Sequence, residues 1–202
     1  GKSTLAMVLL GLLAPDSGRI LVDGQDLATV APPSIPDGIG FVAQDTYLFH
    51  TSIGENLRFA RPDATDDDLV SACRAARIHD LIAGLPRGYD TVVGDRGHRF
   101  SGGERQRLSL ARLLLRDPPI VVLDEATSAL DTRTEAAIRA TLDRRAAART
   151  TVIIAHRLST VRAADQIVVL DHGTVVEQGN HTELMARGGY YRRLVEAGEP
   201  AA

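Results

Sequence analysis

The spacing of apolar residues changes several times along the chain, and each change marks a predicted element. From Leu5 to Leu12 the apolar positions recur at helical spacing, which predicts a helix over residues 3–13. Short apolar runs of strand length follow at 19–22, 39–43, 120–123, 151–155 and 166–170. Helical patterns at 132–148 and 158–163 separate the last three runs. Strands that alternate with helices predict a mainly parallel sheet covered on both faces.

The middle of the chain has a different pattern. Residues 45–116 contain three helical stretches and no strand signal; the helices are expected at 52–59, 66–77 and 102–116. Asp171-His172-Gly173 predicts a tight turn into a strand at 174–177, and two short helices close the chain. We therefore expect an α/β core formed by residues 1–44 and 117–202, interrupted by an α-helical insert at 45–116.

Composition excludes several classes of protein. The chain of 202 residues is 44% hydrophobic and 24% charged, which is typical of a globular protein. Its net charge of −3 gives no strong field for nucleic acid, so no nucleic-acid partner is expected. Cys73 is the only cysteine, so no disulfide forms within one chain. No apolar run reaches the ~20 residues that span a bilayer.

The first four residues carry the first candidate chemistry. Gly1-Lys2-Ser3-Thr4 precedes a predicted helix and matches the end of the phosphate-binding pattern G-x-x-x-x-G-K-[ST]. In that loop, backbone N–H groups hold phosphates, the lysine reaches the β- and γ-phosphates, and the hydroxyl binds Mg²⁺. Lys2 is the only lysine of the chain, which fits a need for a compact point charge. A small polar terminus is the alternative interpretation of these four residues.

A second candidate lies at the end of a predicted strand. Asp124 and Glu125 follow the apolar run 120–123. Carboxylates there lie at the carboxyl edge of a parallel sheet, where ligands bind. Asp124 is a candidate to hold Mg²⁺ through water, and Glu125 a candidate to accept a proton from the attacking water. Two solvated acids at a strand end are the alternative interpretation.

Three further positions are uninformative when taken alone. Ser101-Gly102-Gly103-Glu104 opens a predicted helix and has the form of a capping box, S-x-x-E, whose purpose is structural. The paired glycines make this segment more informative than a capping box alone, because they let a ligand approach the positive end of the helix closely. Gln44 and His156 each follow a predicted strand, and a lone His at a strand end is more often structural than catalytic.

The order of these segments resembles the nucleotide-binding domain of ATP-binding-cassette (ABC) proteins. Gly-Lys-Ser-Thr, Gln44, Ser-Gly-Gly-Glu, the run from Leu123 to Asp131, and Ala155-His156-Arg157 follow one another as in that family. The segment 101–107 is similar to its signature motif, 123–125 to its Walker B motif, and 128–131 to its D-loop. The resemblance covers essentially the whole chain. It implies a P-loop NTPase, RecA-like core with an inserted helical subdomain.

The resemblance also implies roles for these residues. Lys2, Ser3 and their neighbours Gly1 and Thr4 would hold the phosphates of ATP, and Ser3 would also bind Mg²⁺. Gln44 and Asp124 would complete the metal site, Glu125 would be the general base, and His156 would contact the γ-phosphate. A second nucleotide-binding domain would join head to tail. The nucleotide bound to that second domain would be contacted by Ser101, Gly102, Gly103, Glu104 and Asp131 of this chain.

Segments 44–57 and 94–97 resemble exporters in particular. The expected function is therefore ATP hydrolysis that powers export through a transmembrane domain, at the cytoplasmic face of the cell inner membrane. An importer ATPase subunit, a soluble ABC protein and a non-catalytic ATP-binding module are the alternatives. Glu125 argues against the last, because degenerate sites often lose this acid. The resemblance also implies further strands before Gly1, so the chain by itself is expected to hydrolyse ATP negligibly.

Overall fold

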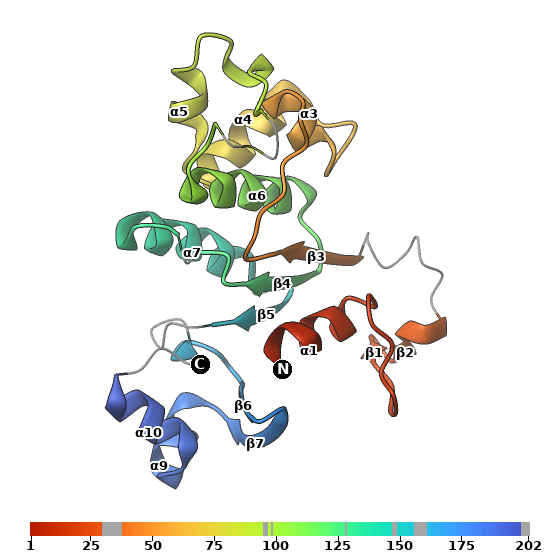
Figure 1. Ribbon diagram of the computed structural model, residues 1–202, viewed down its shortest axis with the longest axis vertical. Helices are drawn as coiled ribbons and strands as arrows, with labels where there is room; N and C mark the ends of the chain where they lie inside the picture. Colours follow the sequence, from red (N-terminus) through yellow and green to blue (C-terminus); the bar gives the residue numbers. More distant parts are fainter. Residues whose placement is uncertain are drawn as a thin grey trace. The chain divides into compact units, whose positions relative to one another are not determined.

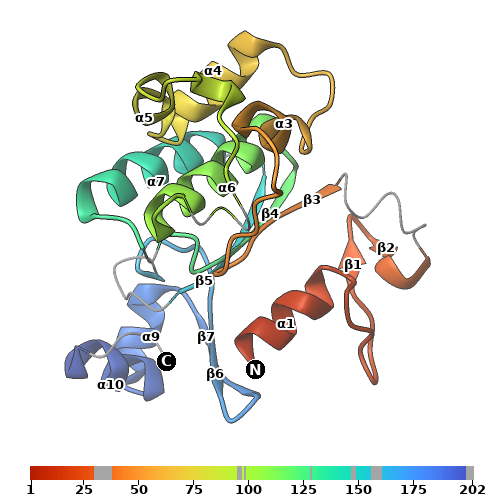
Figure 2. The ribbon, with the colours of Figure 1, turned by 45° about the horizontal axis from the view of Figure 1, so that its top comes forward.

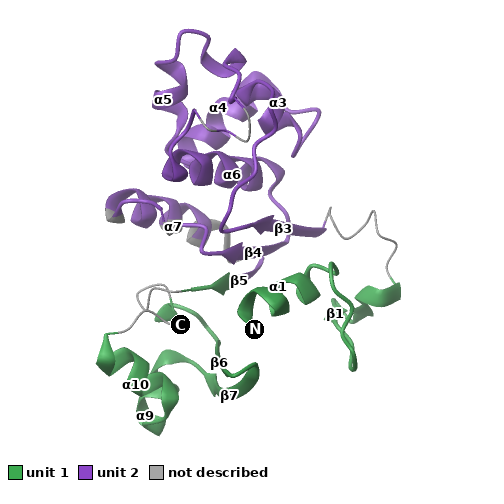
Figure 3. Cartoon of the chain, viewed as in Figure 1, with its two compact units in different colours: residues 1–30, 153–202 green, residues 31–152 purple. Residues whose placement is uncertain are grey.

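The computed structural model describes residues 1–29, 38–94, 97, 99–127, 129–146, 149–155 and 161–198. Two compact units divide the chain (Figure 3). One combines Gly1–Val30 with Ile153–Ala202, and the other is Ala31–Val152. The expected core over 1–44 and 117–202, with its insert at 45–116, stays a prediction. None of the helices within the described residues is long and apolar enough to cross a membrane.

The unit Ala31–Val152 contains a parallel pair of strands and most of the helices that the structure describes (Figure 1). Strand β3 (Ile39–Val42) pairs in parallel with β4 (Ile120–Asp124), with Ile39 opposite Ile120. The sheet order is β3-β4-β5, where β5 is Thr150–Ile154. The helices are α3 (Ile53–Arg58), α4 (Asp66–Ala75), α5 (His79–Ala83), α6 (Gly102–Arg116) and α7 (Thr132–Ala146), with a 3₁₀ turn, η2, at Gly88–Asp90.

Helix α6 packs directly against strand β3, and Figure 2 shows it beside the sheet. Gly40 makes this close approach possible, since a Cβ there would lie 2.4 Å from Leu113 Cδ1 and 2.5 Å from Pro118 Cγ. The buried apolar core of this unit surrounds α6 and includes Leu110 and Val121, both 0% exposed. This packing holds the C-terminal half of α6 against β3.

Arg112 on α6 binds the segment that follows Gln44 through hydrogen bonds. Its Nε donates to Asn56 O at 2.8 Å and its Nη1 to Tyr47 O at 2.8 Å, while its guanidinium lies 5.7 Å from the centroid of the Phe49 ring. The buried Asn56 side chain in turn donates to Phe49 O at 2.9 Å. Burial lowers the pKa of Arg112 to about 10, so it stays charged at neutral pH. One helix therefore holds the backbone between Gln44 and α3.

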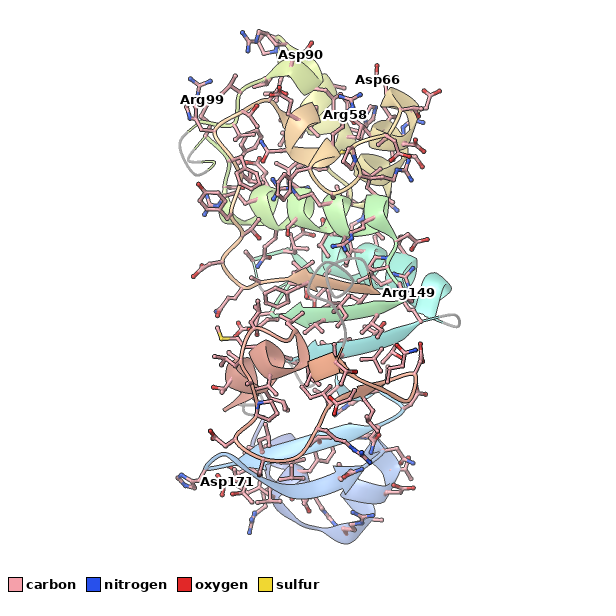
Figure 4. The ribbon with its side chains drawn as sticks, turned by 90° about the vertical axis from the view of Figure 1, so that its right-hand side faces the viewer. Arg58, Asp66, Asp90, Arg99, Arg149 and Asp171 are labelled. Atoms are coloured by element: carbon pink, nitrogen blue, oxygen red, sulfur yellow. The ribbon has the colours of Figure 1, made fainter. Side chains whose placement is uncertain are left out.

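Capping boxes start four of the described helices, and ion pairs support one of them. Ser52, Thr65, Ser101 and Asn180 each accept a hydrogen bond from the third residue of their helix, which bonds back to the cap backbone. Arg58 and Asp66 form an ion pair at the start of α4, and Figure 4 labels both side chains. The helices predicted at 52–59 and 102–116 are confirmed, because serine caps of this kind are readable in the sequence.

The unit of Gly1–Val30 and Ile153–Ala202 holds α1 (Lys2–Leu9) and two antiparallel hairpins. The first joins β1 (Leu21–Val22) to β2 (Gln25–Asp26), before a 3₁₀ turn, η1, at Leu27–Thr29. The second joins β6 (Ile167–Asp171) to β7 (Thr174–Gly179). Helices α9 (His181–Arg187) and α10 (Tyr190–Ala197) follow, and Leu184 and Tyr191 pack against Ile167 and Val169.

Some element boundaries were predicted wrongly. The first helix ends at Leu9 rather than residue 13, because Gly11 takes a φ of 68° and Leu12 N–H bonds back to Met7 O. Helix α4 ends at Ala75 because Arg77 has a φ of 57°. Helix α5 was missed, since five residues without a side-chain cap leave little periodic signal. The helix predicted at 158–163 lies mostly outside the described residues.

Candidate active site

The end of strand β4 places the two predicted acids in different surroundings. Asp124 is the last residue of the strand and its exposed fraction is 9%. Glu125 follows it, is half-buried, and has a φ of 48°, in the left-handed region. For a residue with a Cβ this conformation costs about 1–2 kcal/mol. The backbone thus turns sharply at Glu125, and its side chain leaves the strand in a direction that regular β structure would not give.

Gln44 meets Glu125 directly. Its Nε2 donates to Glu125 Oε2 at 3.2 Å, across 81 residues of sequence. The contact follows from the topology: β3 and β4 are parallel neighbours, so the residues that follow them emerge at the same edge of the sheet. The structure therefore brings together two of the predicted site residues, with Asp124 next to them in the chain.

Gln106 belongs to this cluster and the sequence reasoning missed it. Its side-chain amide donates from Nε2 to Glu125 O at 3.3 Å and accepts at Oε1 from Ala129 N–H at 3.0 Å. The residue is 4% exposed. A usable signal was present, because Gln106 stands in one stripe of α6 with the buried Leu110 and Leu113. A polar residue inside an apolar helical stripe indicates a specific buried partner.

The signature segment opens α6 beside these residues. Ser101 Oγ accepts from Glu104 N–H at 3.3 Å, and Glu104 Oε2 accepts from Ser101 N–H at 2.7 Å, so the capping box is formed. Gly103 lies tightly against the chain at Ala129, since a Cβ on it would be 2.8 Å from Ala129 O. A cavity of about 270 Å³ is lined by Gln44, Asp45, Thr46, Gly102, Arg105, Gln106 and Ala129.

Asp131 has a structural partner of its own. Its Oδ1 accepts from Thr134 N–H at 3.0 Å in the first turn of α7. The hydrogen bonds from the Thr134 hydroxyl and N–H lower the pKa of the Asp131 carboxyl. This caps the helix as an aspartate commonly does. Two other positions that the sequence singled out, Ser128 and His156, lie outside the described residues.

The phosphate segment lies at the start of α1, in the other compact unit. Gly1 is the N-cap residue and makes no side-chain capping bond, while Lys2, Ser3 and Thr4 form the first turn. Ser3 and Thr4 are exposed. The N–H groups of a first helical turn have no partner within their helix, and the positive end of the dipole favours an anion there. A helix start of this kind can bind a phosphate, and this role stays a prediction for Gly1 to Thr4.

Comparison with known families identifies the chain. A family model described as ABC transporter matches residues 1–128. The chain belongs to the ABC transporter family. The predicted α/β, P-loop NTPase fold and the resemblance on which it rested are thereby confirmed, and ATP is the nucleotide that this ABC domain binds.

Two similar ABC transporters are export proteins. The β-(1→2)glucan export ATP-binding/permease protein NdvA of Agrobacterium vitis is 50% identical over 195 residues, which are 96% of this chain and 33% of that protein. An ATM1-type heavy metal exporter of Novosphingobium aromaticivorans is 50% identical over 194 residues, 96% of this chain and 32% of that protein. The chain thus spans about a third of the length of the curated relatives that it matches.

A solved ABC transporter has the same fold. The structure of a bacterial Atm1-family ABC exporter with ATP bound superposes with a TM-score of 0.94 at 48% identity, covering 98% of this chain and 35% of that one. The described strands and helices are therefore those of an ABC ATP-binding domain.

Proposed function

We propose that this chain is the ATP-hydrolysing domain of an ABC exporter, and that hydrolysis at the end of β4 powers export through a transmembrane domain. The observation that carries the proposal is the hydrogen-bonded cluster of Gln44, Glu125 and Gln106 at the carboxyl edge of the sheet. A carboxylate held by an amide at a ligand-binding edge suits activation of a water molecule. The export proteins among the relatives favour this function over an importer subunit.

Three residues would hold Mg²⁺ with the nucleotide. Asp124 supplies a carboxylate, Gln44 an amide oxygen and Ser3 a hydroxyl, and oxygen donors of this kind suit Mg²⁺. Among the described residues no cluster of three or more His, Cys, Asp or Glu side chains is formed. Mg²⁺ is commonly held by one or two carboxylates together with substrate phosphates. Bound there, the ion would neutralise charge on the phosphates.

The remaining residues would position the reactants. Lys2 and the N–H groups of the first turn of α1 would hold the phosphates, with Gly1 and Thr4 beside them. Glu125 would take the proton of the attacking water, and His156 would contact the γ-phosphate. Phosphoryl transfer to water depends mainly on such positioning and on stabilisation of charge.

A second nucleotide-binding domain would complete each site. In the proposed head-to-tail dimer, Ser101 and the paired glycines at the start of α6 would face the nucleotide held by the partner, and Asp131 would contact it as well. Gly102 is exposed and Gly103 half-buried, so a phosphate can approach the positive end of this fifteen-residue helix.

The transmembrane domain would contact an aromatic strip that follows Gln44. Tyr47, Phe49 and Phe59 are 57%, 37% and 69% exposed. Phe49 contacts both other rings, edge-to-face with Tyr47 and tilted with Phe59, and the ring centroids are 5.4 Å and 4.6 Å apart. Exposed aromatic side chains grouped in this way mark an interaction surface. The export ATP-binding/permease protein NdvA is about three times as long as this chain, so it has enough further residues to form a membrane domain. In this proposal such a domain occupies the aromatic surface. Such a partner would hold the chain at the cytoplasmic face of the inner membrane.

Replacing Asp124 with Asn tests the proposed metal site. The amide keeps the shape of the buried side chain and removes its charge. In the full-length protein we expect the Mg²⁺ concentration for half-maximal ATP hydrolysis to rise by about tenfold or more, the scale seen when a group supporting a metal is lost. The measurement is the ATPase rate against Mg²⁺ at fixed ATP. Asp67→Asn, an exposed substitution in the first turn of α4, is the control. An unchanged Mg²⁺ requirement would remove Asp124 from the site.

A further inference from the structure

Gln106 makes two backbone contacts at the candidate active site. Nε2 lies 3.3 Å from the carbonyl oxygen of Glu125, and Oε1 lies 3.0 Å from the nitrogen of Ala129. A carbonyl only accepts and a backbone N–H only donates, so the orientation of the amide is fixed by its partners. Since Gln106 is 4% exposed, both bonds are made away from water, where losing a partner is costly.

The first of these bonds acts on a residue whose backbone is strained. Glu125 has a φ of 48°, and its carboxylate accepts a hydrogen bond from Gln44. A left-handed conformation at a residue with a Cβ persists where the surroundings over-determine it. The Gln106 amide supplies such a restraint, because it holds the backbone carbonyl of Glu125. The side chain of Glu125 extends separately to Gln44.

We propose that Gln106 is a positioning residue for ATP hydrolysis: it holds the backbone of Glu125 in the turn that directs the carboxylate toward the attacking water. This inference rests on the proposed function. The second bond, to Ala129, extends the restraint to the segment against which Gly103 is packed. The Gln106 side chain therefore connects two parts of the proposed machinery. One is the start of α6, which is assigned to the nucleotide of the partner, and the other is Glu125, the base assigned to the chain's own nucleotide.

Two substitutions separate the bonds. Gln106→Glu keeps an acceptor for Ala129 N–H and removes the donor to Glu125 O, whereas Gln106→Leu removes both. In the full-length protein we expect each variant to lower kcat about tenfold, with KM for ATP changed by less than about twofold, because a displaced base slows the chemical step without weakening nucleotide binding. Ser109→Ala, at a half-buried position three residues further along α6, is the control and keeps the kcat of the unchanged protein.

A double-mutant cycle tests whether Gln106 acts through Glu125. Once Glu125→Gln has removed the base, adding Gln106→Leu is expected to lower the residual rate by less than about twofold, since the two residues act as one unit. Rates are expressed per molecule that binds Mg-ATP, so partial misfolding does not imitate the effect. A kcat for both Gln106 variants within about twofold of the Ser109→Ala rate, or a full additional loss in the Glu125→Gln background, would overturn the inference. If the wild-type protein hydrolyses no ATP, that result would overturn the proposed function, and this inference would fail with it.

Discussion

The substitution Glu125→Gln is expected to lower ATP turnover by about two to three orders of magnitude, within the range that a general base contributes. The amide keeps the size of the side chain and its place beside Gln44, but it cannot take a proton from water. Binding of Mg-ATP is expected to persist, because the phosphates are assigned to Lys2 and the start of α1. Closure of two subunits around ATP would then no longer end in hydrolysis, so an ATP-bound dimer should accumulate.

Two measurements check this result. Steady-state phosphate release gives the turnover of the full-length protein, and size-exclusion chromatography after incubation with labelled Mg-ATP gives the nucleotide retained. Glu196→Gln, which removes a carboxylate that pairs with Arg192 on α10, serves as a matched control and should leave both values unchanged. Turnover of the Glu125→Gln protein close to that of the control would show that another group activates the water.

Mixed dimers should show that each nucleotide is shared between subunits. Ser101→Ala alone loses a helix cap, at about 1 kcal/mol of stability, and Lys2→Ala alone loses a phosphate contact. In a dimer with one subunit of each kind, the unchanged Lys2 and the unchanged Ser101 face each other across one head-to-tail site. That single site is expected to be intact, whereas the other site has lost both groups.

Counting retained nucleotides decides the arrangement. The two subunits carry different affinity tags, so that mixed dimers are purified, and both also carry Glu125→Gln so that bound ATP is kept. We expect one ATP per mixed dimer, two per dimer without the Ser101 and Lys2 substitutions, and none when both subunits carry Lys2→Ala. A site built within one chain would be damaged in both subunits, so a mixed dimer that retains no ATP would contradict the head-to-tail model.

The sequence predicted the elements that local chemistry specifies. Ser52 and Ser101 start helices because their hydroxyls satisfy free N–H groups, and this need is readable from S-x-x-E. The end of α1 was predicted wrongly because apolar residues continue past Leu9, although Gly11 turns the backbone there. Leu12 and Leu13 are accordingly 68% and 44% exposed, which periodicity alone would not suggest.

The contacts within the candidate site were predicted only in part. Gln44 and Glu125 were each singled out, and parallel strands explain why they meet. The left-handed backbone of Glu125 and the buried amide of Gln106 were not foreseen, because both depend on how α6 packs against the turn after β4. Tertiary packing of this kind gives only a weak signal in the local sequence. Here the signal is one polar residue, Gln106, within an apolar stripe of α6.

Transport by the full-length protein in inside-out vesicles tests the central claim most directly. The ATP-binding domain then faces the outside, so an exporter accumulates its substrate in the lumen when ATP is added. After incubation with cell extract, mass spectrometry of the vesicle contents should show at least one solute enriched with Mg-ATP in vesicles of the unchanged protein. Vesicles carrying Glu125→Gln, or supplied with a non-hydrolysable ATP analogue, should show no such enrichment. Equal accumulation in both kinds of vesicle, or ATP-driven loss of preloaded solutes, would contradict the account.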